Sequence, residues 1–288
     1  AAVVAFGLSI NLKKTVVMYQ PAPGKPYSPP VIFVNGKTLD VVDKFVYLGS
    51  TISQSGSLDN EISLRIQKAS GAFGKLKQRV WDQHGIKQDT KIMVYRAFVL
   101  TSLLYCSETW TTHVRHIKSL ERFHQNCLRK ILKISWKSLT PDTVVLKQAN
   151  ISSIESLIML SRLRWSGHLV RLSDKRIPKQ LFYGELKLGK RPRHKPKKRY
   201  KDSLKETLKK VKIDYTNWEE EAQNRVEWRH TIKQSVKIFE EDRVKHAELK
   251  RAARKRDIST LTENCDLTIF PCLQCNKICL SNAGLKSH

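Results

Sequence analysis

The sequence is poor in acidic residues, in cysteine and in long apolar runs. Its 288 residues hold 26 Asp and Glu against 53 Lys and Arg, which leaves a formal net charge of +27. No apolar run approaches the roughly 18 residues of a membrane-spanning helix, and no lipidation motif is visible, so we expect no membrane partner. Six cysteines in a chain of this length do not suggest a disulfide scaffold.

Recognisable catalytic patterns are also missing. The sequence has no nucleophile elbow, no phosphate-binding loop and no Ser/His/Asp set, so we expect no small-molecule substrate. Hydrophobic residues make up 40% of the chain, which is enough for real cores and about two domains. The excess of positive charge needs a polyanion to neutralise it, and RNA or DNA is the usual one.

The hydrophobic pattern predicts a mainly α fold with a small N-terminal β part. Residues 1–55 read as strands and turns, with Asn35-Gly36 as a hairpin turn between Val31–Val34 and Thr38–Val42. Residues 56–184 carry apolar side chains at helical spacing and predict a helical bundle. The remaining parts are a basic linker at 185–201, a basic helical segment at 202–258 and a partial ββα zinc finger at 262–288.

Five helices are expected in the bundle. The first is expected to begin with Ser57 or Asp59 as its N-cap. Its apolar positions recur at steps of three and four, and they are Ile62, Ile66, Ala69, Phe73, Leu76 and Val80. The second is expected to start near Asp89 and to carry Ile92, Tyr95, Val99 and Leu103. The third is expected to carry the apolar residues Ile117, Leu120, Cys127, Ile131 and Ile134. The fourth is expected to begin at Thr140-Pro141, and the fifth to span Ile154–Leu172. Beyond the linker, Trp218 and Trp228 are the expected anchors.

The clearest pattern of candidate metal ligands lies near the end of the sequence. The pattern Cys272-x2-Cys275-x12-His288 matches the start of a C2H2 zinc finger, in which a hairpin presents two thiolates and a helix presents an imidazole to Zn²⁺. Cys272, Cys275 and His288 are therefore the expected metal ligands. A fourth ligand would stand three to five residues beyond His288, past the end of the sequence, or Cys265 or Cys279 could replace it. The alternative is a cysteine-containing stub without metal.

The basic linker is the best candidate for contacts with phosphates. Between residues 187 and 201 it holds nine Lys or Arg and no acid, so it cannot build a core. Tyr200 could stack on a base. A nuclear-import signal and a merely solvated linker are the alternatives, and import is compatible with binding. The basic candidates are Lys190, Arg191, Arg193, Lys197, Lys198 and Arg199.

A second set of basic residues surrounds Trp165. Arg162 and Arg164 interleave with this ring, which suggests an edge that faces nucleic acid. The other interpretation places Trp165 in the core and makes the two arginines its solvated flank. Leu163 and Leu169 must also find a core, which favours the second interpretation, and both arginines stay candidate contacts.

Two apparent ligand pairs do not predict a metal site. His113-x2-His116 and His124-x2-Cys127 stand eleven residues apart, which is about 16 Å along one helix. They cannot share one ion, and Cys127 fits the apolar stripe of its helix.

Four local motifs occur in an informative order, namely Gly7–Thr15, Phe45–Ser50, Leu104–Trp110 and Leu163–His168. In order and spacing they resemble the C-terminal part of the reverse transcriptase of non-LTR (LINE-type) retrotransposons. The resemblance extends from about Phe6 to Arg199. It implies a palm remnant followed by the thumb region, and members of this family often carry a Cys/His finger near the C-terminus.

The resemblance also implies what this chain cannot do alone. In the family, the segment that matches Gly7–Thr15 follows a metal-binding turn with two catalytic aspartates, which would lie before Ala1. Without those aspartates and their Mg²⁺ we expect no enzymatic activity from this chain, and Mg²⁺ would matter only in the intact polymerase. Lys14 matches a palm lysine that lies near the incoming triphosphate, and here it has no reaction to assist.

These observations predict a nucleic-acid-binding fragment of a retrotransposon reverse transcriptase. We expect it to hold RNA, DNA or both through its basic helices and linker, in the nucleus, with a possible cytoplasmic ribonucleoprotein stage. The alternative is a domesticated zinc-finger regulator that binds DNA or RNA. A third hypothesis is an inert fragment whose palm-facing apolar surface aggregates.

Overall fold

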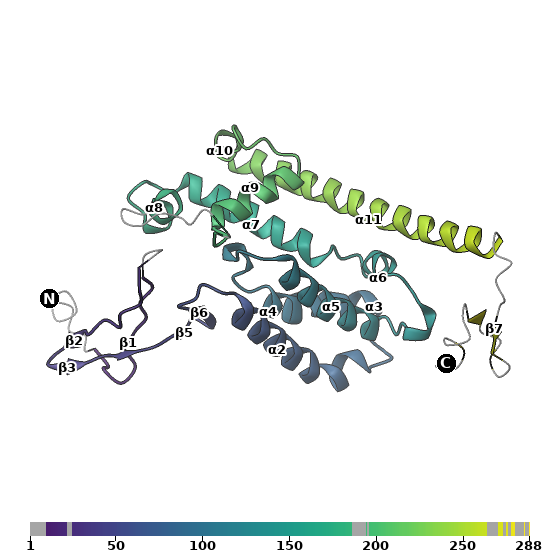
Figure 1. Ribbon diagram of the computed structural model, residues 1–288, viewed down its shortest axis with the longest axis horizontal. Helices are drawn as coiled ribbons and strands as arrows, with labels where there is room; N and C mark the ends of the chain where they lie inside the picture. Colours follow the sequence, from purple (N-terminus) through teal and green to yellow (C-terminus); the bar gives the residue numbers. More distant parts are fainter. Residues whose placement is uncertain are drawn as a thin grey trace. The chain divides into compact units, whose positions relative to one another are not determined.

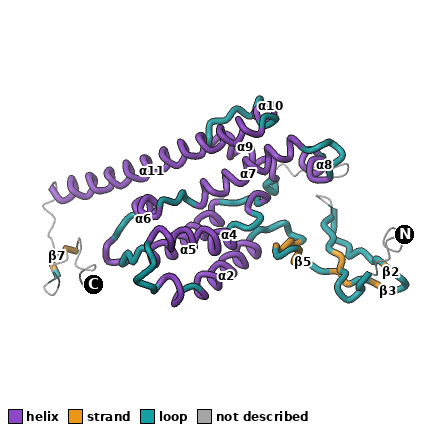
Figure 2. Tube along the Cα trace, turned by 180° about the vertical axis from the view of Figure 1, so that it is seen from behind, coloured by secondary structure: helices purple, strands orange, loops and turns teal. Residues whose placement is uncertain are grey.

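The computed structural model of the chain is mainly helical, as the sequence predicts (Figures 1 and 2). The chain divides into two compact units, Ala1–Glu240 and Glu241–His288. No helix among the described residues is both long and apolar enough to cross a membrane. The structure describes residues 10–21, 25–185, 194, 196–263, 270–272, 275, 278–279, 285 and 288.

Six short strands are described in the N-terminal part of the first unit. Asn35 and Gly36 have φ angles of 50° and 75°, and positive φ at both central residues defines the hairpin turn that Asn-Gly favours. The predicted turn is therefore confirmed, with Val34 opposite Lys37, but the paired strands are shorter than predicted, since Asp40–Val41 pair in parallel with Val16–Val17 instead. The strands are β1 (Val16–Val17), β2 (Phe33–Val34), β3 (Lys37–Thr38), β4 (Asp40–Val41), β5 (Lys44–Tyr47) and β6 (Ser50–Ser53).

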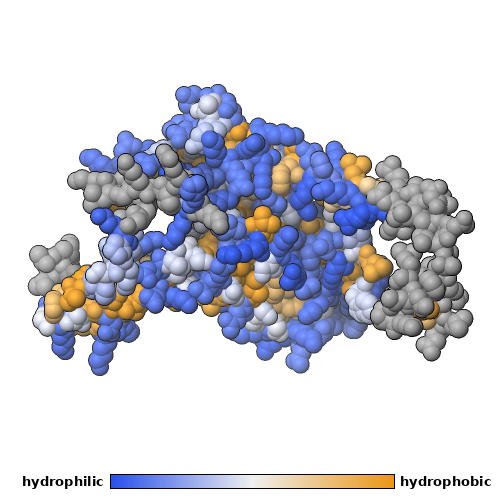
Figure 3. Space-filling model, viewed as in Figure 1, coloured by the Kyte–Doolittle hydropathy of each residue, from blue (hydrophilic) through white to orange (hydrophobic). Residues whose placement is uncertain are grey.

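A second hairpin was not expected from the sequence. β5 and β6 pair antiparallel, and Tyr47 lies opposite Ser50. Leu48 and Gly49, with φ of 47° and 82°, form the turn between them. β1 pairs with β4 in parallel. Apolar side chains such as Val31 and Phe33 are exposed here, and Figure 3 shows hydrophobic residues gathered over these strands.

The helical part of the first unit begins at Asp59. The predicted apolar stripes of its first two helices face a shared core, because Ile62, Ala69, Tyr95, Val99 and Leu103 are buried together. The elements before α5 are α2 (Asp59–Lys75), the π-helix η1 (Lys77–Trp81), α3 (Gln88–Val94), the π-helix η2 (Tyr95–Leu100), α4 (Thr101–Leu103) and the 3₁₀ helix η3 (Ser107–Thr109). They are followed by α5 (Val114–Ile131), the 3₁₀ helix η4 (Trp136–Ser138), α6 (Asp142–Ala149) and α7 (Ile154–Arg171).

Helix ends differ from the predictions by a few residues. α5 ends at Ile131, before the predicted Ile134, because Lys133 adopts a left-handed conformation with φ of 55°. Pro141 is the N-cap of α6 and not its first residue. Ser153 caps α7, where its hydroxyl accepts the N–H of Ser156.

A second core joins α7 to helices that follow the basic linker. Leu163 and Val170 of α7 pack with Leu208 and with the predicted anchors Trp218 and Trp228, all buried. Before the linker lies α8 (Ile177–Tyr183), a helix that the sequence did not suggest. The helices that follow it are α9 (Tyr200–Lys210), α10 (Trp218–Glu221) and α11 (Arg225–Glu263). The first unit therefore contains residues from both sides of the linker.

The second unit contains the C-terminal part of α11 and the cysteine-containing end of the chain. Two short antiparallel strands are described there, β7 (Phe270–Pro271) and β8 (Ile278–Cys279), with Phe270 opposite Cys279.

Candidate metal centre and basic surfaces

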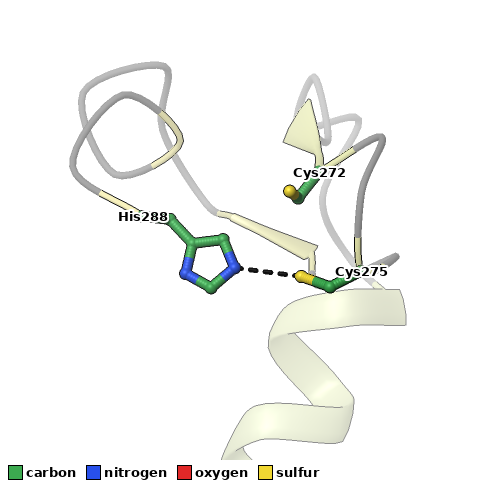
Figure 4. A group of neighbouring side chains, drawn as sticks. All are labelled: Cys272, Cys275 and His288. Atoms are coloured by element: carbon green, nitrogen blue, oxygen red, sulfur yellow. Dashed lines mark hydrogen bonds between the residues drawn. The ribbon is translucent and has the colours of Figure 1, made fainter.

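Three side chains converge at the end of the chain. Cys272 directly follows β7, Cys275 lies in the turn before β8, and His288 is the last residue. Their ligand atoms all lie within 4.8 Å of one another. Figure 4 shows the two sulfurs and the imidazole facing one another, with His288 Nε2 3.0 Å from Cys275 Sγ.

This arrangement fits the ligand chemistry of a transition metal. Thiolate sulfur binds zinc at about 2.3 Å and imidazole nitrogen at about 2.0–2.1 Å, so one ion can reach all three atoms. Cys272 is partly buried, while Cys275 and His288 are exposed. Among the described residues, this is the one group of three or more such side chains placed to hold a metal ion. The side chains of Cys265 and Cys279, the alternative fourth ligands, lie outside what is described.

The basic linker is only partly described. Lys190, Arg191 and Arg193 lie outside the described residues. Lys197 and Arg199 are exposed, and Lys198 is partly buried.

The described end of the linker is fastened to the first unit. Lys197 Nζ donates to the carbonyl of Ser55 at 2.9 Å. Lys198 Nζ donates to the carbonyl of Thr112 at 3.3 Å and forms an ion pair with Glu206. The hydrogen bond from Lys198 lowers the pKa of Glu206 below its ordinary value.

Arg199 lies between two carboxylates. Its guanidinium is 3.7 Å from Glu185 and 3.7 Å from Asp202, and its backbone N–H donates to Asp202 at 2.9 Å. This contact stabilises the start of α9, because the Asp202 carboxylate in the first turn accepts the backbone N–H of the N-cap residue Arg199. Arg199 therefore has a structural role in addition to its exposed charge.

Tyr200 does not lie on the surface as a stacking residue would. Its hydroxyl is buried without a hydrogen-bond partner among the described residues, and its ring lies 5.9 Å from that of Phe182. Burial raises the pKa of Tyr200 above its usual range. The structure thus leaves this ring partly buried, because α9 begins at Tyr200 and turns it toward Phe182 of α8.

Arg162 is buried, against the expectation of a surface arginine. Only 5% of it is exposed. Its guanidinium donates to Thr207 Oγ1 at 2.7 Å, to the carbonyl of Trp110 at 2.8 Å and to Thr112 Oγ1 at 3.3 Å. Desolvation lowers the pKa of Arg162. This side chain holds three segments together and is not placed to meet a phosphate.

The neighbouring positions on α7 match a solvated flank. Arg164 and His168 are exposed, and Trp165 is partly buried with its ring centroid 5.3 Å from that of His168. Arg164 is therefore the one of the two predicted arginines that a nucleic acid could reach. Lys14 is also exposed, in a turn where its N–H donates to the carbonyl of Asn11.

The two rejected ligand pairs take part in separate polar contacts. His116 Nε2 lies 2.9 Å from Asp59 of α2. His124 Nδ1 lies 2.7 Å from the hydroxyl of Tyr95, and Cys127 is buried in the core. Burial raises the pKa of the Cys127 thiol to about 12, which suits a packing role.

One exposed residue that the sequence analysis did not single out is Trp136, in the loop between α5 and α6. It is 80% exposed, next to lysines. The sequence held a signal for it, because this tryptophan follows the last position of the α5 stripe and belongs to no apolar period.

The chain is similar to a transposon-derived protein. It is 26% identical over 241 residues to an uncharacterized transposon-derived protein of Caenorhabditis elegans, and the match covers 80% of this chain and 84% of that protein. No protein-family model matches the chain. No solved structure matches it. The similarity points to a transposon origin for this mainly helical chain.

Proposed function

We propose that the chain is the nucleic-acid-binding part of a reverse transcriptase from a non-LTR retrotransposon. The observation that carries the proposal is the match to a transposon-derived protein over most of both chains. The four ordered motifs support the reverse transcriptase within that origin, with residues 1–55 as a palm remnant and 56–184 as its thumb region. On this proposal, the chain holds RNA or DNA in the nucleus and does not itself polymerise.

The charge distribution supports nucleic acid as the partner. A net charge of +27 over 288 residues favours binding to a polyanion, and exposed side chains such as Lys197, Arg199 and Arg164 carry part of it. Lys190, Arg191 and Arg193 belong to the same proposed surface.

The Cys272, Cys275 and His288 group supports a zinc-binding finger within this function. Two thiolates and an imidazole are ligands that Zn²⁺ prefers, and a closed structural site takes four. The candidate fourth ligands are Cys265, Cys279 and a residue three to five positions after His288. Bound zinc would fix the hairpin of β7 and β8 against the segment that ends at His288.

The first test is the salt dependence of binding. We expect the protein to bind labelled single-stranded RNA and DNA with an affinity that falls linearly on a logarithmic scale as NaCl increases, in a fluorescence anisotropy titration. Replacing Lys197, Lys198 and Arg199 by Gln should reduce the slope by about two, because each lost phosphate contact removes about 0.7–0.9.

A matched control removes the same charge elsewhere. Lys75 at the end of α2, Lys77 at the start of η1 and Lys87 before α3 are exposed, and their replacement by Gln should change the slope by less than the linker variant does. Equal effects of the two triple variants would reject the linker as the site. Affinity that does not depend on salt would reject nucleic-acid binding through phosphates.

A second candidate function is a domesticated regulator that reads sequence through the finger. The convergence of Cys272, Cys275 and His288 favours it. It predicts a sequence preference that disappears on chelation with EDTA, whereas the first proposal predicts binding that tolerates most sequences. Sequencing the encoding transcript separates the two further, since an upstream frame with an Asp-Asp turn would support the polymerase origin.

A further inference from the structure

Figure 1 shows the loop that joins α5 to α6. This loop presents two large apolar side chains to solvent. We call Leu132–Thr140 the Trp136 loop. Trp136 is 80% exposed and Leu139 is 84% exposed. The other tryptophans behave differently, since Trp165 is partly buried and the remaining ones, Trp81, Trp110, Trp218 and Trp228, lie in the cores. Large apolar side chains that are exposed together on a folded protein commonly mark a contact surface.

The backbone of the Trp136 loop is held in place at its first turn. Lys133 is left-handed, and the N–H of Ile134 donates to the carbonyl of Arg129 at 2.9 Å, which closes the end of α5. Ser138 Oγ donates to the carbonyl of Ser135 at 2.7 Å.

The far end of the loop is also fastened. The N–H of Leu139 donates to the carbonyl of Trp136 at 3.3 Å, and Arg129 reaches across to the carbonyl of Thr140 at 2.6 Å. The indole is therefore presented from an ordered backbone, and little conformational entropy is lost when something binds it.

The charged side chains within the loop all have one sign. From Arg122 to Pro141 the sequence contains no Asp or Glu. Lys130, Lys133 and Lys137 are exposed, while Arg129 is paired with Asp142 at 2.7 Å. An exposed indole between unopposed lysines fits a ligand that offers a flat apolar face and regularly spaced negative charges.

We propose that the Trp136 loop binds single-stranded nucleic acid, with the Trp136 indole stacked on an unpaired base and Lys133 and Lys137 near the flanking phosphates. Every base has a face that can stack, so the contact tolerates any sequence. In a duplex the base faces are already covered, which makes single strands the preferred ligand. This inference rests on the proposed function and adds to it a site outside the basic linker.

The test uses the intrinsic fluorescence of the full chain. Titration with a single-stranded twelve-nucleotide DNA should quench the exposed indole, because a base stacked on the ring quenches its excited state by electron transfer. The variant W136F should lose this quenching and keep most of the affinity. The variant W136A should bind the single strand about tenfold more weakly, and a duplex of equal length less than twofold more weakly.

Phe98 provides a matched control, because it is an aromatic side chain that is 60% exposed on η2. We expect F98A to bind the single strand as the wild type does. Since both residues are on the surface, neither substitution should change the melting temperature appreciably.

The outcomes separate this inference from the proposed function. Salt-dependent binding by all variants, without quenching and without a loss in W136A, would reject the Trp136 loop and support the proposed function. Absence of any binding by the wild type would reject both. Quenching by anionic phospholipid vesicles with none by the oligonucleotide would overturn the inference in favour of a membrane contact.

Discussion

At the scale of single residues, the structure distinguishes arginines that the sequence could not tell apart. Arg162 and Arg164 stand two positions apart on α7, yet one is buried and the other exposed. A buried guanidinium is tolerated only when acceptors satisfy it, and Arg162 finds the Trp110 carbonyl and the hydroxyls of Thr112 and Thr207.

Because one arginine is buried and the other is exposed, replacing each by alanine should change the free energy of unfolding by very different amounts. We expect R162A to lower the free energy of unfolding by roughly 3 kcal/mol, because a buried acceptor left without its donor costs about 1–3 kcal/mol. The control R164A should change it by less than about 0.5 kcal/mol, as exposed substitutions do. Urea denaturation followed by circular dichroism measures both. Similar losses in the two variants would contradict the assigned role of Arg162.

His124 is a second residue whose environment decides its chemistry. Its ring is fully buried, its Nδ1 meets the Tyr95 hydroxyl, and its Nε2 has no hydrogen-bond partner among the described residues. Burial lowers the pKa of His124 from 6.5 to about 4, because the charged form loses its hydration.

This pKa predicts a loss of stability in mild acid. Below about pH 6.5 the unfolded chain binds a proton on His124 that the folded chain accepts only near pH 4, so stability falls as the pH drops between these values. The slope approaches about 1.4 kcal/mol per pH unit. Urea denaturation between pH 7 and pH 4.5 should show this slope reduced in H124Q and retained in H84Q, which changes an exposed histidine. A slope that persists in H124Q would assign the effect to other groups.

At the scale of elements, the contact of α7 with α11 explains a glycine in the Leu163–His168 motif. Trp228 of α11 is buried, and its Nε1 donates to the carbonyl of Leu163 at 2.9 Å. A Cβ at Gly167 would overlap the Trp228 indole. Glycine therefore lets the two helices approach closely enough for the indole to reach the backbone of α7.

Gly167→Ala should consequently destabilise the protein by about 1–3 kcal/mol, the usual cost of overpacking a core. Gly71→Ala is the matched control, because Gly71 lies in α2 with open space around it. That change should stabilise the protein by about 0.5–1 kcal/mol, the difference in helix propensity between the two residues. Thermal denaturation of both variants tests the pair, and a neutral Gly167→Ala would contradict the packing of Trp228 against α7.

At the scale of the whole molecule, the cores and the candidate metal centre belong to different units. The buried apolar residues of both cores lie between Ile62 and Val236, within Ala1–Glu240. Cys272, Cys275 and His288 belong to Glu241–His288. Metal loss should therefore act on the second unit.

We predict that the purified protein contains zinc, detected by mass spectrometry, and that C272S and C275S each lose it, because a structural site with a missing thiolate binds far more weakly. Removal of the metal by EDTA should leave the main thermal transition of the helices unchanged within about 2 °C, since no core residue is a ligand. A large drop in that transition would show that the metal also supports the first unit.

The sequence by itself determined the features that depend on neighbours along the chain. Spacing at three and four predicted the buried stripe of α2 and the length of α7, because a helix turns every 3.6 residues. Asn35-Gly36 predicted its hairpin, because both residues accept positive φ. Cys272 and Cys275 predicted a convergent pair, because a short turn brings them together.

Only the tertiary structure decided which charged and aromatic side chains face solvent. Arg162 is buried and Tyr200 partly buried because α9 packs on α7, across a linker whose composition says nothing of this contact. Trp136 is exposed because α5 ends before it and its side chain packs on neither core, although Leu132 and Ile134 of the same loop do contact the first core. The periodicity of a sequence identifies the apolar face of each helix. Which polar and aromatic side chains become buried depends on the element that packs against them, and this is decided by contacts between residues far apart in the sequence.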